Sequence, residues 1–116
     1  MTIAQRELTD GVWLVSVDGR LDHTQTPALE NTLNALIDEG HHRLIVDLSE
    51  LTYINSGGLR CLVTAWRKAK KEEGNLLLSG LRARVLEVFS MVGFDKVFDV
   101  YPTREAAQQV WQREQP

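Results

Sequence analysis

The stretch "YINSGGLRCL", residues 53–62, decides the fold of this chain. A hydroxyl side chain, Ser56, stands between an amide and two glycines, and apolar residues at helical spacing follow it directly. The segment predicts the point at which a strand gives way to a helix. Ser56 or Asn55 can accept a hydrogen bond from a free N–H of the first helical turn, while Gly57 and Gly58 ease the bend.

The same geometry permits a second interpretation of Ser56. A helix N-terminus carries unpaired N–H groups and a partial positive charge, so an anion placed there is stabilised. A phosphate on Ser56 would bring roughly −1.5 to −2 charges and would change the sign of the surface around it. A 100-fold loss of affinity for a partner requires only about 2.8 kcal/mol. The residues alone leave Ser56 as either a helix cap or a phosphorylation switch.

The segments on both sides predict an alternation of strands and helices. Strands are expected at 3–8, 11–19, 42–49, 75–80 and 96–101, and helices at 23–40, from 56 to the segment 71–75, at 81–93 and at 102–114. The first two strands form a hairpin through "TDG", with the first strand at a sheet edge. The later alternation predicts an α/β domain with a mainly parallel sheet, and residues 112–116 are expected to fray.

Turn-forming residues and apolar spacing assign caps and buried faces to these helices. Thr24 or Thr26 is expected to cap the first helix, with Pro27 in its first turn, and Thr103 to cap the last. The faces expected to point inward are Leu29, Leu33, Leu36 and Ile37; Leu59, Leu62, Val63 and Trp66; Val85, Leu86 and Phe89; and Ala106, Ala107, Val110 and Trp111.

Composition narrows the class of protein. The 116 residues are 43% apolar and 25% charged, which is typical of one globular domain. Thirteen basic and 16 acidic residues give a net charge of −3 without a basic block, so no nucleic-acid footprint is present. The N-terminus lacks the apolar run of a signal peptide, and no apolar stretch approaches the roughly 18 residues of a membrane span. We expect a cytoplasmic protein without membrane insertion.

Residues that suggest catalysis or metal binding lack the partners such chemistry needs. The three histidines have no carboxylate or thiol at ligand spacing, so no metal and no cofactor is expected. Cys61 has no evident base, and a packed cysteine is expected. Asp47 ends an apolar strand as the phosphorylated aspartate of a response-regulator receiver does, but we expect it to orient the following loop. Without a nucleophile–base pair or a phosphate loop, the protein is not expected to be an enzyme.

Three segments carry a resemblance to a known family. "DGRLD" at 18–22, "LIVDLSELTYINSGGLRCLV" at 44–63 and "MVGFDKVFDVYPTREAA" at 91–107 resemble a STAS domain, most closely that of the bacterial anti-sigma factor antagonists. The segments occur in the family's order over nearly the whole chain. The resemblance implies a single STAS domain over residues 1–116, with a mixed, mainly parallel sheet of four to five strands, about four helices and an N-terminal edge hairpin.

The resemblance also implies partner switching. In that scheme the unphosphorylated antagonist binds an anti-sigma factor that is itself a serine kinase of the histidine-kinase-like ATPase type, phosphorylation of one serine separates the two, and a serine phosphatase resets the switch. Ser56 stands where that serine stands, and Asp22 matches an acidic residue beside the site. The residues expected to border the partner surface are Asp22, Leu21, Asn55, Gly57, Gly58 and Arg60. The free protein is expected to be a monomer.

Two positions depart from the family pattern, and they keep an alternative open. Asn55 stands where many antagonists have an aspartate, and Gly57 stands where a hydroxyl residue is frequent. The alternative is a STAS subunit of an ABC-type lipid transporter, which would bind the ATPase as a structural partner without phosphorylation.

Overall fold

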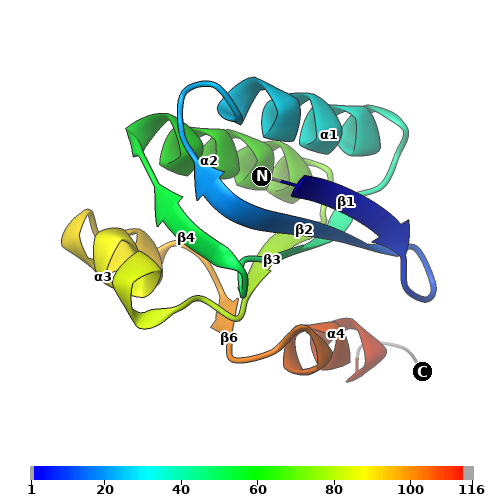
Figure 1. Ribbon diagram of the computed structural model, residues 1–116. Helices are drawn as coiled ribbons and strands as arrows, with labels where there is room; N and C mark the ends of the chain where they lie inside the picture. The colour runs from blue at the N-terminus through cyan, green and yellow to red at the C-terminus, as the bar shows by residue number, and fades with distance from the viewer. Residues whose placement is uncertain (1, 114–116) are drawn as a thin grey trace.

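The computed structural model describes residues 2–113, and in it one mixed sheet is covered by helices on both faces (Figure 1). The strands are β1 (Thr2–Glu7), β2 (Val12–Leu21), β3 (Arg43–Asp47), β4 (Leu51–Ile54), β5 (Asn75–Ser79) and β6 (Val100–Tyr101). The helices are α1 (Thr26–Asp38), α2 (Ser56–Lys71), α3 (Ala83–Met91) and α4 (Arg104–Arg113), with a short 3₁₀ helix, η1, at Phe94–Lys96. The expected fold class is confirmed, but the described residues form a sheet of six strands in place of the four to five expected.

The sheet runs in the order β1-β2-β3-β5-β6, and β4 pairs separately with the end of β2. The hairpin pair β1–β2 is antiparallel, and every other pair is parallel. The first half of β2 pairs with β3, whereas Gly19, Arg20 and Leu21 pair with β4. The register shifts between Gly19 and Arg20, and Gly19 has a φ of +89°, which a residue without Cβ adopts readily. This irregularity lets β2 pair first with β3 and then with β4 along the edge opposite β1.

The helices divide into two layers. The buried faces of α1, α2 and α3 form a single apolar cluster with one face of the sheet. On the opposite face α4 packs alone, through Ala107 and Trp111, against Leu14, Ile45 and Leu77 (Figure 1). The central strands are therefore buried on both sides, as their nearly continuous apolar sequences require.

Several local expectations are corrected. The segment "ELTYI" contains a further strand, β4, and the last strand is only Val100–Tyr101 because η1 occupies part of the expected segment. Gln25, rather than Thr24 or Thr26, occupies the N-cap position of α1, and no side chain caps it. Leu86 is 37% exposed, while Val85 and Phe89 are buried as expected. Of the tail expected to fray, Gln112 and Arg113 belong to α4, and 114–116 lie outside the described residues.

The first turn of α2 lies directly on the sheet. A Cβ atom added to Gly58 would come within 2.8 Å of Ile54 Cγ1 and 2.9 Å of Leu21 Cδ2, distances that real Cβ atoms do not tolerate. A Cβ on the neighbouring Gly57 would meet its nearest atom, Asn55 Oδ1, at 3.4 Å. Glycine at 58 is thus required by the close approach of helix and strands, and glycine at 57 is not.

This difference predicts opposite effects of two adjacent substitutions. Gly58→Ala should lower the free energy of unfolding by about 1–3 kcal/mol, because the new methyl group overpacks the contact with Leu21 and Ile54. Gly57→Ala should leave it unchanged or raise it by up to about 1 kcal/mol, because alanine favours the helix. Urea unfolding of both variants measures this, and equal stabilities would contradict the packing described here.

Candidate functional site

The candidate site is the junction between β4 and α2. Asn55 has an extended backbone, and its side-chain Oδ1 accepts a hydrogen bond of 3.0 Å from the N–H of Gly58. Asn55 is therefore the N-cap of α2, one of the two caps that the sequence allows. Ser56 is the first helical residue and is exposed, and within residues 2–113 its hydroxyl group makes no hydrogen bond. The Ser56 hydroxyl group is therefore not used to cap the helix.

The end of β2 supports this junction from beneath. Leu21 pairs with Ile54, and the N–H of Asn55 donates to the carbonyl oxygen of Leu21 over 3.2 Å. Leu21 is fully buried and Gly58 is also buried, so these two residues hold the helix start in place. Both are expected at the partner surface from the family resemblance, but the structure buries them inside the fold.

Asp22 organises the loop that connects β2 with α1. Its Oδ1 accepts hydrogen bonds from the N–H of Thr24 (3.1 Å) and from the Thr24 hydroxyl (2.7 Å), and its backbone oxygen accepts one from the Thr26 hydroxyl (2.9 Å). The bond from the Thr24 hydroxyl lowers the pKa of the Asp22 carboxyl, which is therefore ionised at neutral pH. The two threonines that sequence spacing offered as helix caps are engaged with Asp22 instead.

The loop organised by Asp22 lies close to the start of α2. A Cβ on Gly57 would be 3.9 Å from Thr26 Oγ1, so the first turns of α1 and α2 are neighbours. Asp22, which is half-buried, anchors the loop that brings Thr26 next to Gly57. The approach of these two segments was expected only from the family resemblance.

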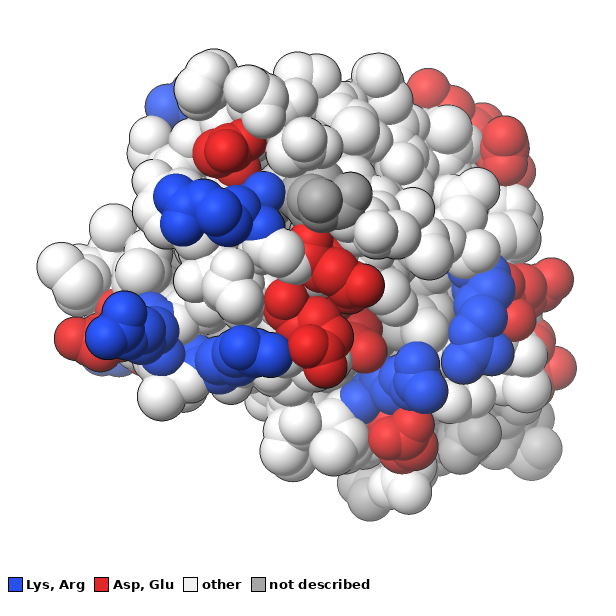
Figure 2. Space-filling view, viewed as in Figure 1, with Lys and Arg blue, Asp and Glu red and all other residues white. Residues whose placement is uncertain are grey.

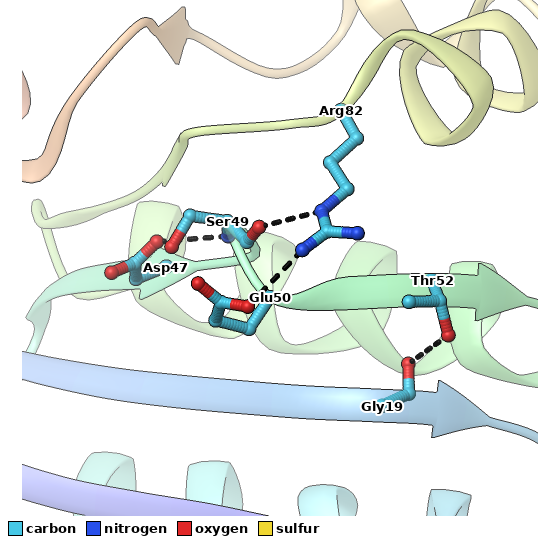
Figure 3. A network of polar contacts seen from close by, with 6 residues as sticks. All are labelled: Gly19, Asp47, Ser49, Glu50, Thr52 and Arg82. Atoms are coloured by element: carbon cyan, nitrogen blue, oxygen red, sulfur yellow. Dashed lines mark hydrogen bonds and ion pairs between the residues drawn. The ribbon is translucent and has the colours of Figure 1, made fainter.

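The turn between β3 and β4 is tied to the segment before α3 (Figure 3). Arg82 donates from Nε to the carbonyl oxygen of Ser49 (2.9 Å) and from Nη2 to Glu50 Oε2 (3.1 Å). Asp47 Oδ1 accepts from the N–H of Ser49 at 3.0 Å, which confirms the expected loop-orienting role of Asp47. Thr52 in turn donates to the carbonyl oxygen of Gly19 at 3.1 Å. These contacts connect the turn before β4 with β3 and the segment before α3, and β4 itself with the end of β2.

Charge is unevenly distributed around the site. Arg60 lies one turn after Ser56, is exposed, and takes part in no ion pair within the described part of the chain. Arg20 lies over the ring of Tyr53, with 4.2 Å between its Cζ and the ring centroid. On the face that shows β4 and α3, acidic side chains gather near the start of β4 with basic groups on both sides (Figure 2). Asp18 and Glu50 belong to a cavity there, away from Ser56.

The remaining candidates have structural roles. Cys61 is buried, and burial raises the pKa of its thiol to about 11, with a smaller contribution from the carboxylate of Glu30. His41 stacks on Trp13 with 4.7 Å between ring centroids, and His42 Nε2 lies 3.2 Å from the carbonyl oxygen of Ile37. Among residues 2–113, no three His, Cys, Asp or Glu side chains are grouped to hold a metal ion. None of the helices described is both long and apolar enough to cross a bilayer.

Comparison with known proteins assigns the family. A model of the STAS domain matches residues 4–107. The chain belongs to the STAS domain family. This STAS domain is 36% identical over 98 residues to BtrV of Bordetella bronchiseptica, which is provisionally described as an anti-sigma factor antagonist, and the alignment covers 84% of each chain.

Solved structures agree with this assignment. An anti-sigma factor antagonist from Mycobacterium paratuberculosis superposes with a TM-score of 0.83 at 32% identity, covering 94% of this STAS domain and 93% of that chain. The phosphorylated form of the Bacillus cell fate determinant SpoIIAA superposes with a TM-score of 0.75 at 18% identity, covering 94% and 99% of the two chains. The second likeness concerns the fold alone.

Because Asn55 caps α2 and Ser56 does not, substitutions at these two positions should affect stability unequally. Asn55→Ala should cost about 1 kcal/mol of unfolding free energy, because the N–H of Gly58 loses its acceptor. Asn55→Asp should preserve the cap and gain about 0.3–1 kcal/mol from its charge at the helix N-terminus. Ser56→Ala should change stability by less than about 0.5 kcal/mol. Thermal and urea unfolding test the series, and a larger loss for Ser56→Ala than for Asn55→Ala would reassign the cap.

The raised pKa of Cys61 predicts slow alkylation of the native protein. At pH 8 the thiolate is scarce and the side chain is buried, so iodoacetamide should react far more slowly than with the urea-unfolded chain. The native rate should increase with pH until the thiol ionises near its pKa of about 11. Mass spectrometry of timed samples measures both rates. Rapid native labelling at pH 8 would show that Cys61 is accessible and its thiolate stabilised.

Proposed function

We propose that this protein is an anti-sigma factor antagonist that works by phosphorylation-controlled partner switching. Its unphosphorylated form binds an anti-sigma factor, a serine kinase of the histidine-kinase-like ATPase type, in the cytoplasm. Phosphorylation of Ser56 by that kinase releases the complex, and a serine phosphatase restores the binding form. The protein acts as a regulator and not as an enzyme.

The observation that carries the proposal is the freedom of Ser56. Its hydroxyl group is exposed at the first position of α2, and Asn55 already satisfies the helix by binding the N–H of Gly58. A kinase can modify such a hydroxyl without breaking a hydrogen bond that the fold needs. Relatives described as anti-sigma factor antagonists support the same role.

The electrostatics of the junction explain why phosphorylation would separate partners without unfolding the domain. A dianion at the first turn of α2 interacts favourably with the free N–H groups and with the helix dipole. When a partner covers this surface, the same dianion must lose its bound water, which costs free energy. It is also repelled by any acidic group of the partner. The modification is therefore tolerated by the domain and opposed by the complex.

Paired baits test this function. Ser56→Ala and Ser56→Asp proteins are used for pulldown from lysate of the native cells, and bound proteins are identified by mass spectrometry. A histidine-kinase-like ATPase should be retained by Ser56→Ala and lost by Ser56→Asp, because only the second carries a negative charge at the helix start. The purified ATPase should phosphorylate the wild-type protein but not Ser56→Ala.

The opposite pattern would support the alternative function. A transporter ATPase retained equally by both baits would indicate a STAS subunit of an ABC-type lipid transporter. Ser56 would then have no role in switching. Retention of the histidine-kinase-like ATPase by both baits would refute control through this serine while leaving the partner in place.

A further inference from the structure

A groove of about 360 Å³ runs along the outward side of α2, between that helix and the segment that follows α3. Its apolar lining consists of Leu59 and Val63 from α2 and of Val92 and Phe94 from the far side. Val92 is 52% exposed. Apolar side chains this open beside a groove are typical of a surface that another protein covers.

Basic side chains border the same groove. Arg60 and Arg67 line it together with Ser56, and the spacing of four and seven residues places all three on one side of the helix. Both arginines are exposed, and across residues 2–113 neither forms an ion pair. Ser56 therefore stands at one end of an apolar groove whose two guanidinium groups are available.

The charge of α2 differs from that of the whole protein. The helix contains Arg60, Arg67, Lys68, Lys70 and Lys71 and no acidic residue, whereas the chain has a net charge of −3. A basic helix on an acidic protein attracts acidic partners to one side of the molecule and orients them on approach. The occupant that fits combines apolar side chains with carboxylates.

We propose that this groove binds an acidic, apolar segment of the anti-sigma kinase, and that a phosphate on Ser56 competes with the carboxylates of that segment for Arg60. The proposal rests on the function proposed above and identifies the surface and the chemistry of its partner. An arginine pairs with a carboxylate or a phosphate through the same paired N–H donors, so the two anions exclude each other.

This competition adds an intramolecular step to the effect of the phosphate. The phosphate would lie one helical turn from Arg60, where side chains four residues apart meet. Pairing within the helix removes the positive charge that the partner segment uses and places a negative charge at the end of the groove. Arg67 lies two turns further along and continues to attract the segment in both forms.

The first test removes charges at matched positions on the same helix. Binding of the purified ATPase captured by the Ser56→Ala bait is measured by calorimetry for Arg60→Gln, Arg67→Gln and Lys68→Gln. Lys68 hydrogen-bonds to Asn34 of α1 over 3.0 Å, so its variant loses the same charge away from the groove. Each arginine variant should weaken binding about tenfold, as loss of a charge-assisted bond does, while Lys68→Gln should stay within about twofold.

The second test addresses the apolar wall. Val92→Asp should weaken binding at least about tenfold, because it places a carboxylate in a groove that receives carboxylates. Val97→Asp is the control, because Val97 is also exposed (39%) but does not line the groove. Circular dichroism and thermal unfolding show whether both variants fold. An effect confined to Val92→Asp supports the groove, and equal effects contradict it.

The competition itself is tested by combining two substitutions. If the charge at position 56 acts partly by occupying Arg60, then Ser56→Asp should reduce affinity less in the Arg60→Gln background than in the wild type. Strictly additive losses would overturn the competition. A different result would overturn the groove but leave the switch intact. In that case Ser56→Asp fails to bind the ATPase, while the arginine variants and Val92→Asp bind it with wild-type affinity. Failure of every bait to retain such an ATPase would refute the proposed function, and the groove assignment with it.

Discussion

The contact of Gly58 with Leu21 and Ile54 is the constraint on which the candidate site depends. It joins the ends of two parallel strands to the first turn of α2, and the distance between them leaves no room for a side chain at position 58. Because the helix starts so close to the sheet, the strand must turn abruptly, and Asn55 at the turn takes the capping position. The next residue, Ser56, then emerges at the surface. Its exposure follows from the packing beneath it.

The stability of the junction and the proposed regulation depend on different neighbouring residues. Asn55 and Gly58 maintain the junction through a hydrogen bond and a close contact, and Leu21 closes it from below. Ser56 contributes to none of these interactions within the described residues, so its chemistry can change while the fold persists. The contacts of Arg82 with Ser49 and Glu50 tie the turn before β4 to the segment before α3 (Figure 3).

The local sequence pattern was sufficient to predict much of the architecture. The alternation of strands and helices, the buried faces of α1 and α4 and the cap at Thr103, whose hydroxyl accepts from the N–H of Ala106, all follow from short-range spacing. β4 could not be predicted in this way. Its residues are buried only at its two ends, Leu51 and Ile54, because it pairs with a bent strand, so it lacks the alternation of a half-buried strand.

Contacts distant in sequence account for the other differences. The spacing that offered Thr24 and Thr26 as caps was correct for a helix start, but Asp22 binds both hydroxyls after β2 delivers it to that position. The groove beside α2 was equally hidden, since Val92 and Phe94 approach Arg67 only in the folded chain. Family resemblance anticipated that the loop after β2 would approach the start of α2, because it carries information about tertiary structure that periodicity does not.

The amide at position 55 has an electrostatic consequence for the switch. An aspartate there would cap α2 equally well, but it would hold a negative charge next to Ser56 in every state of the protein. With Asn55 the cap is neutral, so position 55 does not weaken the positive field of the helix N-terminus and of Arg60. In the proposed switch the contrast between the two states of Ser56 is then larger, because position 55 adds no second carboxylate to that of Asp22. A neutral cap therefore fits the proposed switch, in which a phosphate on Ser56 must be stable and must change the affinity for an acidic partner steeply.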